Sequence, residues 1–363
     1  MTRDAPPASR RRALGLLGGA AAAPLAAPAV ASAQPARKWR LVTSWPRSLP
    51  GPGDSARRLA ERIRTMSGGR LEVELFAAGE IVPAFAVLDA VSGGVAEMGH
   101  TASFFWAGKM PAAALFTTAP FGPGPVEHQA WIEKRGGQDL WDRLYAPFQV
   151  RAFLAGNTGP SMGGWFRKEI RDAAELATLR IRVQGLGGDV YKELGATPMA
   201  IPPGDVFVAL ERGTIDAVEL LAPANDLPLG LYRHAPFYYA PGFNKPNGAA
   251  EALVSEAAWA DLSPDLRAVV RNACAAEHSA GLAEAEASNA AALVQLVQQG
   301  AKVTSFPPDV LAAARRAAEA VIDRIAARDA LSGEIVASYR AAVADGRAWA
   351  RLQGFMAQQI RVG

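Results

Sequence analysis

Two arginines that alternate with apolar residues are the strongest candidates for binding chemistry in this sequence. Arg180 and Arg182 lie on either side of Ile181. In an extended chain both arginines point to one face and the apolar residues point to the other. A guanidinium held at a strand end can donate two parallel N–H groups to a ligand carboxylate. The alternative interpretation is that both arginines are ordinary solvated surface residues.

A carboxylate in apolar surroundings is the second candidate. Glu219 ends a strand-like segment that starts at Ile215, and it precedes Leu220 and Leu221. Burying a carboxylate is costly unless it is paired with a cation or binds one. An arginine and a glutamate at the ends of neighbouring strands would form an acid-binding cleft, because open α/β sheets bind ligands beyond the carboxyl ends of their strands.

A serine motif offers a different chemistry. Residues Gly159-Pro160-Ser161-Met162-Gly163 match G-x-S-x-G, the turn that presents the nucleophilic serine of α/β hydrolases. That turn requires a strand before it and a helix after it, whereas Gly164–Arg167 has a strand-like pattern. A secreted serine hydrolase that uses Ser161, with His234 or His278 as the base, is the enzyme alternative.

Aromatic residues gather at Phe104-Phe105-Trp106, shortly after His100. Such clusters pack in cores, and they also line pockets for small organic ligands. The sequence leaves both interpretations open.

Composition limits the classes of function. Of 363 residues, 50% are hydrophobic and 20% are charged, which is typical of a globular protein with a sizeable core. A net charge of +3 without a basic run argues against nucleic acid as a partner. The 4 histidines do not have the spacing of a metal site. Cys274 is the single cysteine, so an intrachain disulfide is excluded. We predict that Cys274 is a buried structural thiol.

Residues 1–33 have the features of an export signal. Arg10–Arg12 precede a short apolar run, and Ala31–Ala33 form a small-x-small cleavage site. The consecutive arginines resemble a Tat signal. Sec export is the alternative, because Ala13 stands where the Tat pattern has phenylalanine. We expect a mature chain that starts near Gln34 and functions in the periplasm.

The elements that must position these residues alternate between strand and helix patterns, which predicts an α/β fold with parallel strands. The predicted strands are 38–44, 71–75, 148–155, 162–166, 179–183 and a segment starting at 215. The predicted helices lie between Asp54 and Gly68 and at 81–92, 187–195, 206–212, 263–299, 309–328 and 332–360. The Pro- and Gly-rich stretch 223–248 is predicted to be a long irregular connection.

Six segments carry a resemblance to a known family. They are WRLVTSWP (39–46), AEMGHTASFFWAGK (96–109), ALFTTAPFG (114–122), GNTGPSMGGWFRKEI (156–170), LRIRVQG (179–185) and ALERGTIDAVE (209–219). In these segments the sequence resembles the periplasmic substrate-binding subunits of TRAP transporters, a DctP-like family, and most of all the branch that binds 2-oxo and related monocarboxylic acids. The resemblance makes the hydrolase motif a coincidence.

The resemblance implies a periplasmic-binding-protein-like α/β fold with two lobes. Hinge strands would join the lobes, a long helix would touch both, and the ligand would be clamped between them. Lobe I would comprise 34–157 with about 249–305, and lobe II would comprise 158–248. A C-terminal helical segment, 306–363, would pack on the lobes or across a dimer.

The resemblance also assigns candidate roles. Arg182 falls on the carboxylate-binding arginine, and Glu219 on a carboxylate that helps to hold a metal ion beside the ligand. Asn157 starts the segment that faces the cleft. Phe104 or Phe105 falls where the branch has tyrosines that touch the ligand.

Several positions depart from the branch. Ser161 replaces the glutamine that binds metal and ligand, Leu220 replaces the tryptophan after the glutamate, and Phe243-Asn244 replaces the late cleft aromatics. Phe104 and Phe105 lack the tyrosine hydroxyls. Metal cations prefer several oxygen donors at once, so the loss of one donor argues against the ion of the branch. A sodium or calcium ion beside the ligand stays an open alternative, and the changed pocket favours a larger or more apolar acid.

The resulting expectation is a non-enzymatic binding protein that captures a small organic carboxylate and delivers it to TRAP membrane subunits. A ligand sensor for a signalling kinase is an alternative that the sequence does not separate from transport. A homodimer formed through the C-terminal helix is a further expectation.

Overall fold

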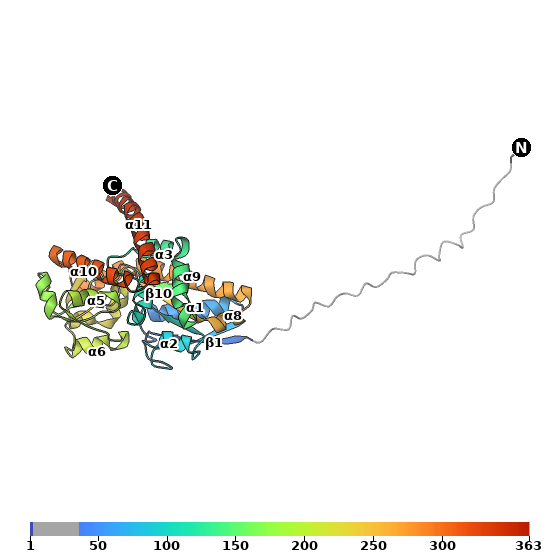
Figure 1. Ribbon diagram of the computed structural model, residues 1–363, viewed down its shortest axis with the longest axis horizontal. Coiled ribbons are helices and arrows are strands. Elements are labelled where there is room, and N and C mark those ends of the chain that lie inside the picture. Colours follow the sequence, from blue (N-terminus) through green and yellow to red (C-terminus); the bar gives the residue numbers. More distant parts are fainter. Residues whose placement is uncertain (3–35, 363) are drawn as a thin grey trace. The chain divides into compact units, whose positions relative to one another are not determined.

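The computed structural model of the protein describes residues 1–2 and 36–362 (Figure 1). Residues 3–35 lie outside the described residues. They include nearly all of the predicted export signal and the predicted mature start near Gln34. From Ala36 onward the chain forms one unit that contains two β-sheets.

The first sheet has five strands in the order β2-β1-β3-β10-β4. They are β1 (Arg37–Thr43), β2 (Leu71–Phe76), β3 (Met98–Thr101), β4 (Val150–Asn157) and β10 (Ala249–Ser255). As predicted for alternating strands and helices, β1 pairs in parallel with β2 and β3. β10 returns from far along the chain and is antiparallel to β3 and β4.

Helices α1 (Pro52–Met66) and α2 (Val87–Ser92) cover opposite faces of this sheet. Leu41 of β1 packs in one apolar cluster with Leu59 and Ile63 of α1. The next residue, Val42, packs in another cluster with Val87 of α2. Successive side chains of a strand point to opposite faces, so the two helices enclose the sheet from both sides.

The second sheet has six strands in the order β11-β9-β5-β8-β6-β7. They are β5 (Gly164–Phe166), β6 (Arg180–Arg182), β7 (Thr197–Met199), β8 (Ala217–Val218), β9 (Phe237–Ala240) and β11 (Lys302–Ser305). β6 is parallel to β7 and β8, whereas β5 is antiparallel to β8 and β9. Trp165 stacks on Tyr238 with ring centroids 3.7 Å apart, which joins β5 to β9 in a buried core.

Two predicted elements were wrong. The helix predicted from Ile81 begins only at Val87, because residues 81–86 form turns around Pro83, whose ring restricts the residue before it. The stretch 223–248 is not wholly irregular, because it contains α7 (Pro223–Asp226) and β9. The flanking prolines 236 and 241 concealed β9, which lies inside the sheet and buries Tyr238 and Tyr239.

The chain passes between the two sheets three times, and two of these crossings lie side by side. It leaves the first sheet after Asn157 and returns through Asn247 and Gly248. Asn157 Nδ2 donates to Asn247 Oδ1 at 2.9 Å, and Thr158 N donates to Gly248 O at 3.0 Å. Two lobes joined by a pair of bonded crossing segments are therefore present, as the two-lobe fold class predicted.

The long helix predicted at 263–299 is α9 (Pro264–Gln298). It packs on β4 and α1 of the first lobe and on α7 of the second. Cys274 is buried in its inner face, and burial raises the pKa of the thiol well above its ordinary value, as expected of a structural cysteine.

Strand β11 follows α9 and pairs in parallel with β9. The sequence had assigned residues up to about 305 to lobe I, but this pairing places Lys302–Ser305 in the second sheet. Residues 302–305 therefore belong to the second lobe, because their strand partner β9 lies there.

The chain ends in α10 (Pro308–Ala326) and α11 (Ala330–Val362). α10 packs on α5 (Leu186–Glu193), and α11 packs on α10, α3 (Pro125–Lys134) and α4 (Gly137–Tyr145). The other α-helices are α6 (Val206–Glu211) and α8 (Glu256–Asp261). The second half of α11 extends away from the helices around it (Figure 1). Within the described residues, no helix combines the length and apolarity that a membrane crossing requires.

Candidate functional site

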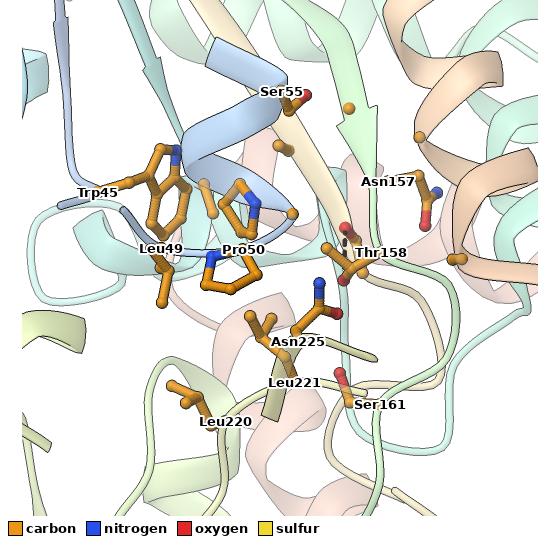
Figure 2. A pocket seen from close by; sticks show the side chains of 18 of the residues that line it. Trp45, Leu49, Pro50, Ser55, Asn157, Thr158, Ser161, Leu220, Leu221 and Asn225 are labelled. Atoms are coloured by element: carbon orange, nitrogen blue, oxygen red, sulfur yellow. Dashed lines mark hydrogen bonds between the residues drawn. The ribbon is translucent and has the colours of Figure 1, made fainter. Parts of the chain in front are cut away.

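A cavity of about 250 Å³ lies between the two lobes. Trp45, Leu49 and Pro50 form its wall on the side of the first sheet, and Leu220, Leu221 and Asn225 face them from the second (Figure 2). Of the predicted site residues, the cavity brings together Arg182, Asn157, Ser161, Phe104, Phe105 and Leu220. These six come from segments far apart in the sequence.

Arg182 is a buried cation whose orientation is fixed by main-chain oxygens. It ends β6 and is only 2% exposed. Nε donates to Ile201 O at 3.0 Å and Nη1 donates to Glu219 O at 2.8 Å. Within the described residues Nη2 has no acceptor, so it is the nitrogen that remains for a ligand. Burial lowers the pKa of Arg182 to about 10, which still leaves it charged at neutral pH.

Arg180 has the opposite environment on the same strand. It is exposed, and its Nε and Nη2 donate to Asp216 at 2.9 and 2.7 Å. The interpretation of ordinary surface arginines is therefore right for Arg180 and wrong for Arg182. The difference is set by position, because only Arg182 reaches the end of the strand at the cavity.

Glu219 is 1% exposed and is paired with a residue that the sequence analysis missed. Its Oε1 lies 2.9 Å from Lys245 Nζ, and both side chains are buried. The same ammonium donates to Leu220 O. The sequence had indicated that Glu219 needs a cation, but the signal for Lys245, a lysine in an otherwise uncharged segment, was not used.

Arg58 also lines the cavity, but its charge is already balanced. Its guanidinium contacts Glu277 at 2.7 Å and Glu284 at 3.0 Å. Of the cations that line the cavity within the described residues, Arg182 and Lys245 are the two that are buried.

Ser161 has neither the turn nor the base of a hydrolase. It lies in the loop between β4 and β5, and a strand rather than a helix follows. Its Oγ is buried and has no hydrogen-bond partner within the described residues. His278 is instead bonded to Gly156 O at 2.9 Å, and His234 lies 3.9 Å from Glu211. The hydrolase alternative is therefore not supported.

Asn157 lines the cavity, yet its amide is used within the protein. Its Nδ2 donates to Asn247, and its Oδ1 accepts from Gly159 N at 2.8 Å. Asn157 thus holds the crossing segments together and presents little free hydrogen-bonding capacity to a ligand.

The aromatic residues both pack together and line the cavity. Phe105 lies between Trp45 and Phe104, with ring centroids 5.6 and 4.7 Å away. Trp45, which the sequence analysis missed, donates from Nε1 to His100 Nδ1 at 2.8 Å. Burial lowers the pKa of His100 to about 4, so the imidazole stays neutral and accepts this bond.

Phe243 does not line the cavity, in contrast to the sequence-based expectation. It is 4% exposed and packs in the core against Phe121 and Phe306, with ring centroids 5.2 and 5.4 Å away. The main chain turns between Phe243 and Lys245, so the lysine rather than the phenylalanine reaches the cavity.

Glycines allow the two lobes to approach each other closely. Gly185 precedes α5 of the second lobe, and a Cβ added there would lie 2.6 Å from Phe104 Cβ of the first. A Cβ on Gly51 would likewise collide with Asn225 Nδ2. The main chain at these two glycines leaves no room for a Cβ beside the opposite lobe, which indicates a closed cleft.

We predict that Gly185→Ala weakens ligand binding by about tenfold, because the added methyl group opposes closure against Phe104. Gly185 has φ +62° and ψ −147°, a conformation that is essentially restricted to glycine, so the substitution also costs about 2 kcal/mol of stability. Gly213→Ala is the matched control, since Gly213 has φ +70° and no atom within 4 Å of an added Cβ. Calorimetry should show weakened binding for Gly185→Ala alone; equal affinity of both variants would contradict the closure argument.

The chain is similar to known proteins over most of its length. The family model of bacterial extracellular solute-binding proteins, family 7, matches residues 43–329. The monocarboxylate 2-oxoacid-binding periplasmic protein of Nostoc sp. is 38% identical over 315 residues, which cover 87% of this chain and 86% of that protein.

Solved structures resemble the chain over most of its length. A TRAP transporter solute-binding protein from Bordetella bronchiseptica, a dimer with calcium and picolinate in one site, has a TM-score of 0.88 at 35% identity and covers 91% of this chain and 98% of that chain. A TRAP periplasmic solute-binding protein from Pseudoalteromonas atlantica with sodium and pyruvate gives 0.85 at 33% identity, covering 88% and 98%. One from Colwellia psychrerythraea with calcium and pyruvate gives 0.86 at 33%, covering 89% and 99%.

Proposed function

The chain belongs to the DctP family, family 7 of the bacterial extracellular solute-binding proteins, and we propose that it captures a small organic carboxylate for a TRAP transporter. In this proposal the protein works in the periplasm and delivers its ligand to TRAP membrane subunits. It acts as a binding protein and not as an enzyme, in line with its relatives.

One observation carries the ligand class. Arg182 is a buried guanidinium with two nitrogens anchored on carbonyl oxygens and the third left at the cavity. Among the described residues no carboxylate pairs directly with this buried cation, which is costly, and a ligand carboxylate removes that cost with a charge-assisted hydrogen bond. The site is therefore built for an anion.

The remaining walls define the rest of the ligand. Trp45, Phe104, Leu220 and Leu221 present apolar surface around the charged end. Pyruvate and picolinate, the acids in the similar structures, share a carboxylate next to an oxygen or nitrogen acceptor. A 2-oxo or 2-hydroxy acid with an apolar substituent fits this combination.

Binding and closure are coupled. Asn157, Asn247 and Thr158 fix the crossing segments, so the lobes move about a short hinge. The ligand touches both lobes only in the closed form, and it shifts the equilibrium toward that form. Closure also removes water, which strengthens the polar contacts inside.

A thermal-shift screen tests the proposal. The mature protein is heated with pyruvate, picolinate and longer 2-oxo and 2-hydroxy acids, and a ligand raises the melting temperature by mass action. The amide of each acid is the control, since it keeps the shape and removes the charge. Calorimetry then gives the affinity. Equal binding of acids and amides, or binding of neither, would rule out a carboxylate receptor.

We also propose a homodimer formed through α11. Trp349, Leu352 and Phe355 on its second half are 56%, 48% and 59% exposed. Exposed apolar groups on one helix indicate an interface, and a second copy of the chain is the occupant we propose because the similar Bordetella protein is a dimer.

We predict that Phe355→Glu with Trp349→Glu converts the protein from dimer to monomer, because charges replace the apolar contacts of the interface. Light scattering after gel filtration gives the mass. Val208→Glu, at an apolar position of α6 that is 42% exposed, is the control and should leave the dimer intact. A wild-type chain that elutes as a monomer contradicts the prediction.

A further inference from the structure

The similar structures hold calcium or sodium together with their ligand, and the residues of this cleft do not fit such an ion. Calcium and sodium need several oxygen donors that are free to coordinate. Within the described residues there is no group of three His, Cys, Asp or Glu side chains that could hold a metal. Ser161, where the family resemblance implies a glutamine, supplies a single hydroxyl.

An ammonium already stands beside the oxygens that would attract a metal ion. Lys245 Nζ lies 2.9 Å from Glu219 Oε1 and donates to Leu220 O. A side-chain carboxylate and the next main-chain carbonyl thus surround the ammonium, as oxygen ligands surround a metal ion. The main chain keeps the lysine in place, because Ser161 N donates to Lys245 O at 3.0 Å.

The charges around this point also oppose a metal. Lys245 and Arg182 both line the cavity, and Arg182 Nη1 is bonded to the carbonyl of Glu219 itself. Of the nearby carboxylates, Asp226 accepts bonds from Trp165 Nε1 and Tyr238 Oη, both at 2.9 Å. A divalent cation beside Glu219 would have to displace the ammonium or share its place, and like charges at such distances repel strongly.

The ammonium retains one donor for a ligand. It has three N–H groups: one donates to Leu220 O, and the ammonium also forms an ion pair with Glu219. Lys245 lines the cavity, and its Nζ lies 5.7 Å from the centre of the Phe104 ring of the opposite lobe. A remaining N–H group can therefore donate to a ligand held between the lobes.

We propose that Lys245 is the built-in cation of this cleft, which replaces the metal ion and makes ligand binding independent of sodium and calcium. The inference rests on the proposed carboxylate-binding function. Arg182 binds the ligand carboxylate, and the remaining N–H group of Lys245 donates to the oxygen on the adjacent carbon. This arrangement selects acids with an acceptor at that carbon.

The first test measures metal and needs no organic ligand. Purified mature protein, freed of loosely held ions on a chelating resin, is analysed for calcium by mass spectrometry and titrated with calcium chloride by calorimetry. The wild type is expected to hold no stoichiometric calcium. Lys245→Gln is expected to gain calcium binding, because the ammonium is replaced by an oxygen donor beside Glu219. Stoichiometric calcium in the wild type would overturn the proposal.

The second test uses pyruvate and picolinate as probes, in a sodium-free choline buffer with EDTA and in the same buffer with excess calcium. The wild-type Kd should change by less than about twofold between the buffers, and Lys245→Met should bind at least about tenfold more weakly in both. A wild-type Kd that improves tenfold or more with calcium, or an unchanged Kd of Lys245→Met, contradicts the proposal.

A paired variant guards against misfolding. Lys245→Met leaves Glu219 buried without a counter-charge, so Glu219→Gln with Lys245→Met is made in parallel, and both are checked by circular dichroism and melting temperature. The double variant should fold and still bind weakly. If no acid binds the wild type in either buffer, the carboxylate function fails, while the metal measurement still decides whether Lys245 fills the cation position.

Discussion

Arg182→Ala is expected to weaken binding of the carboxylate ligand by at least about 2 kcal/mol, or about 30-fold in Kd. The substitution removes the charge-assisted contact in a cleft from which closure excludes water. Arg182→Lys should lose part of this affinity, since an ammonium keeps the charge but not the planar fork that bonds Ile201 O and Glu219 O. Calorimetry with the strongest acid from the thermal-shift screen measures both losses.

Arg180→Ala is the matched control for this experiment. It removes the same side chain from the same strand, but the lost contact is an exposed pair with Asp216. Exposed ion pairs contribute little to stability, and Arg180 does not line the cavity. Affinity should stay within about twofold of wild type. Unchanged affinity of a folded Arg182→Ala protein would remove Arg182 from the site and with it the carboxylate proposal.

Glu251→Gln is expected to stabilise the protein at alkaline pH by several kcal/mol. Glu251 lies on β10 in the interior of the first sheet and is fully buried. It accepts bonds from Trp106 Nε1 at 3.0 Å and Tyr145 Oη at 3.1 Å, and within the described residues no cation is paired with it. Burial raises its pKa from 4.5 to about 8, and these two bonds only partly oppose the change.

The sign of the pH dependence follows from proton binding. Between about pH 4.5 and 8 the folded chain holds a proton on Glu251 that the unfolded chain has released. The free energy of unfolding is therefore highest at the acid end of this window and falls as pH rises through it. At 1.36 kcal/mol for each pH unit the fall approaches about 5 kcal/mol. Glutamine keeps a neutral group of the same shape and does not titrate.

Urea unfolding at several pH values between about 5 and 9 tests this prediction. The wild type should lose stability across the range, and Glu251→Gln should lose much less. Some slope should remain, because burial also raises the pKa of Asp226 to about 6. Glu72→Gln, the same change at an exposed position of β2, should follow the wild type. Parallel curves for wild type and Glu251→Gln would show that Glu251 does not titrate in this window.

Local patterns in the sequence determined much of the fold. The alternation in β1 and the helix start and stop signals of α1 and α9 were sufficient, because each depends on neighbours along the chain. The family resemblance rested on ordered segments, and it supplied the two-lobe architecture that periodicity alone did not. Neither the local patterns nor the resemblance predicted strands β10 and β11, because the pairing of strands depends on contacts between segments that are distant in the sequence.

The sequence also indicated some residues of the candidate site, while the structure decided the others. Alternation on one strand singled out Arg180 and Arg182, and only the register of β6 beside β8 showed which of them ends at the cavity. The apolar neighbours of Glu219 indicated that it needed a cation, while the identity of that cation depended on the turn that carries Lys245 across the cleft. The resemblance assigned Phe243 to the cleft, but the turn sends it into the core and brings Lys245 to the cavity.

The sequence by itself determined that Glu219 and Arg182, once buried, would have to be balanced, because the cost of burying charge depends on residue type. Only the tertiary structure decided which groups balance them, because a salt bridge or a ligand contact is set by distance in space, and the chain brings residues 182, 219 and 245 together only by folding.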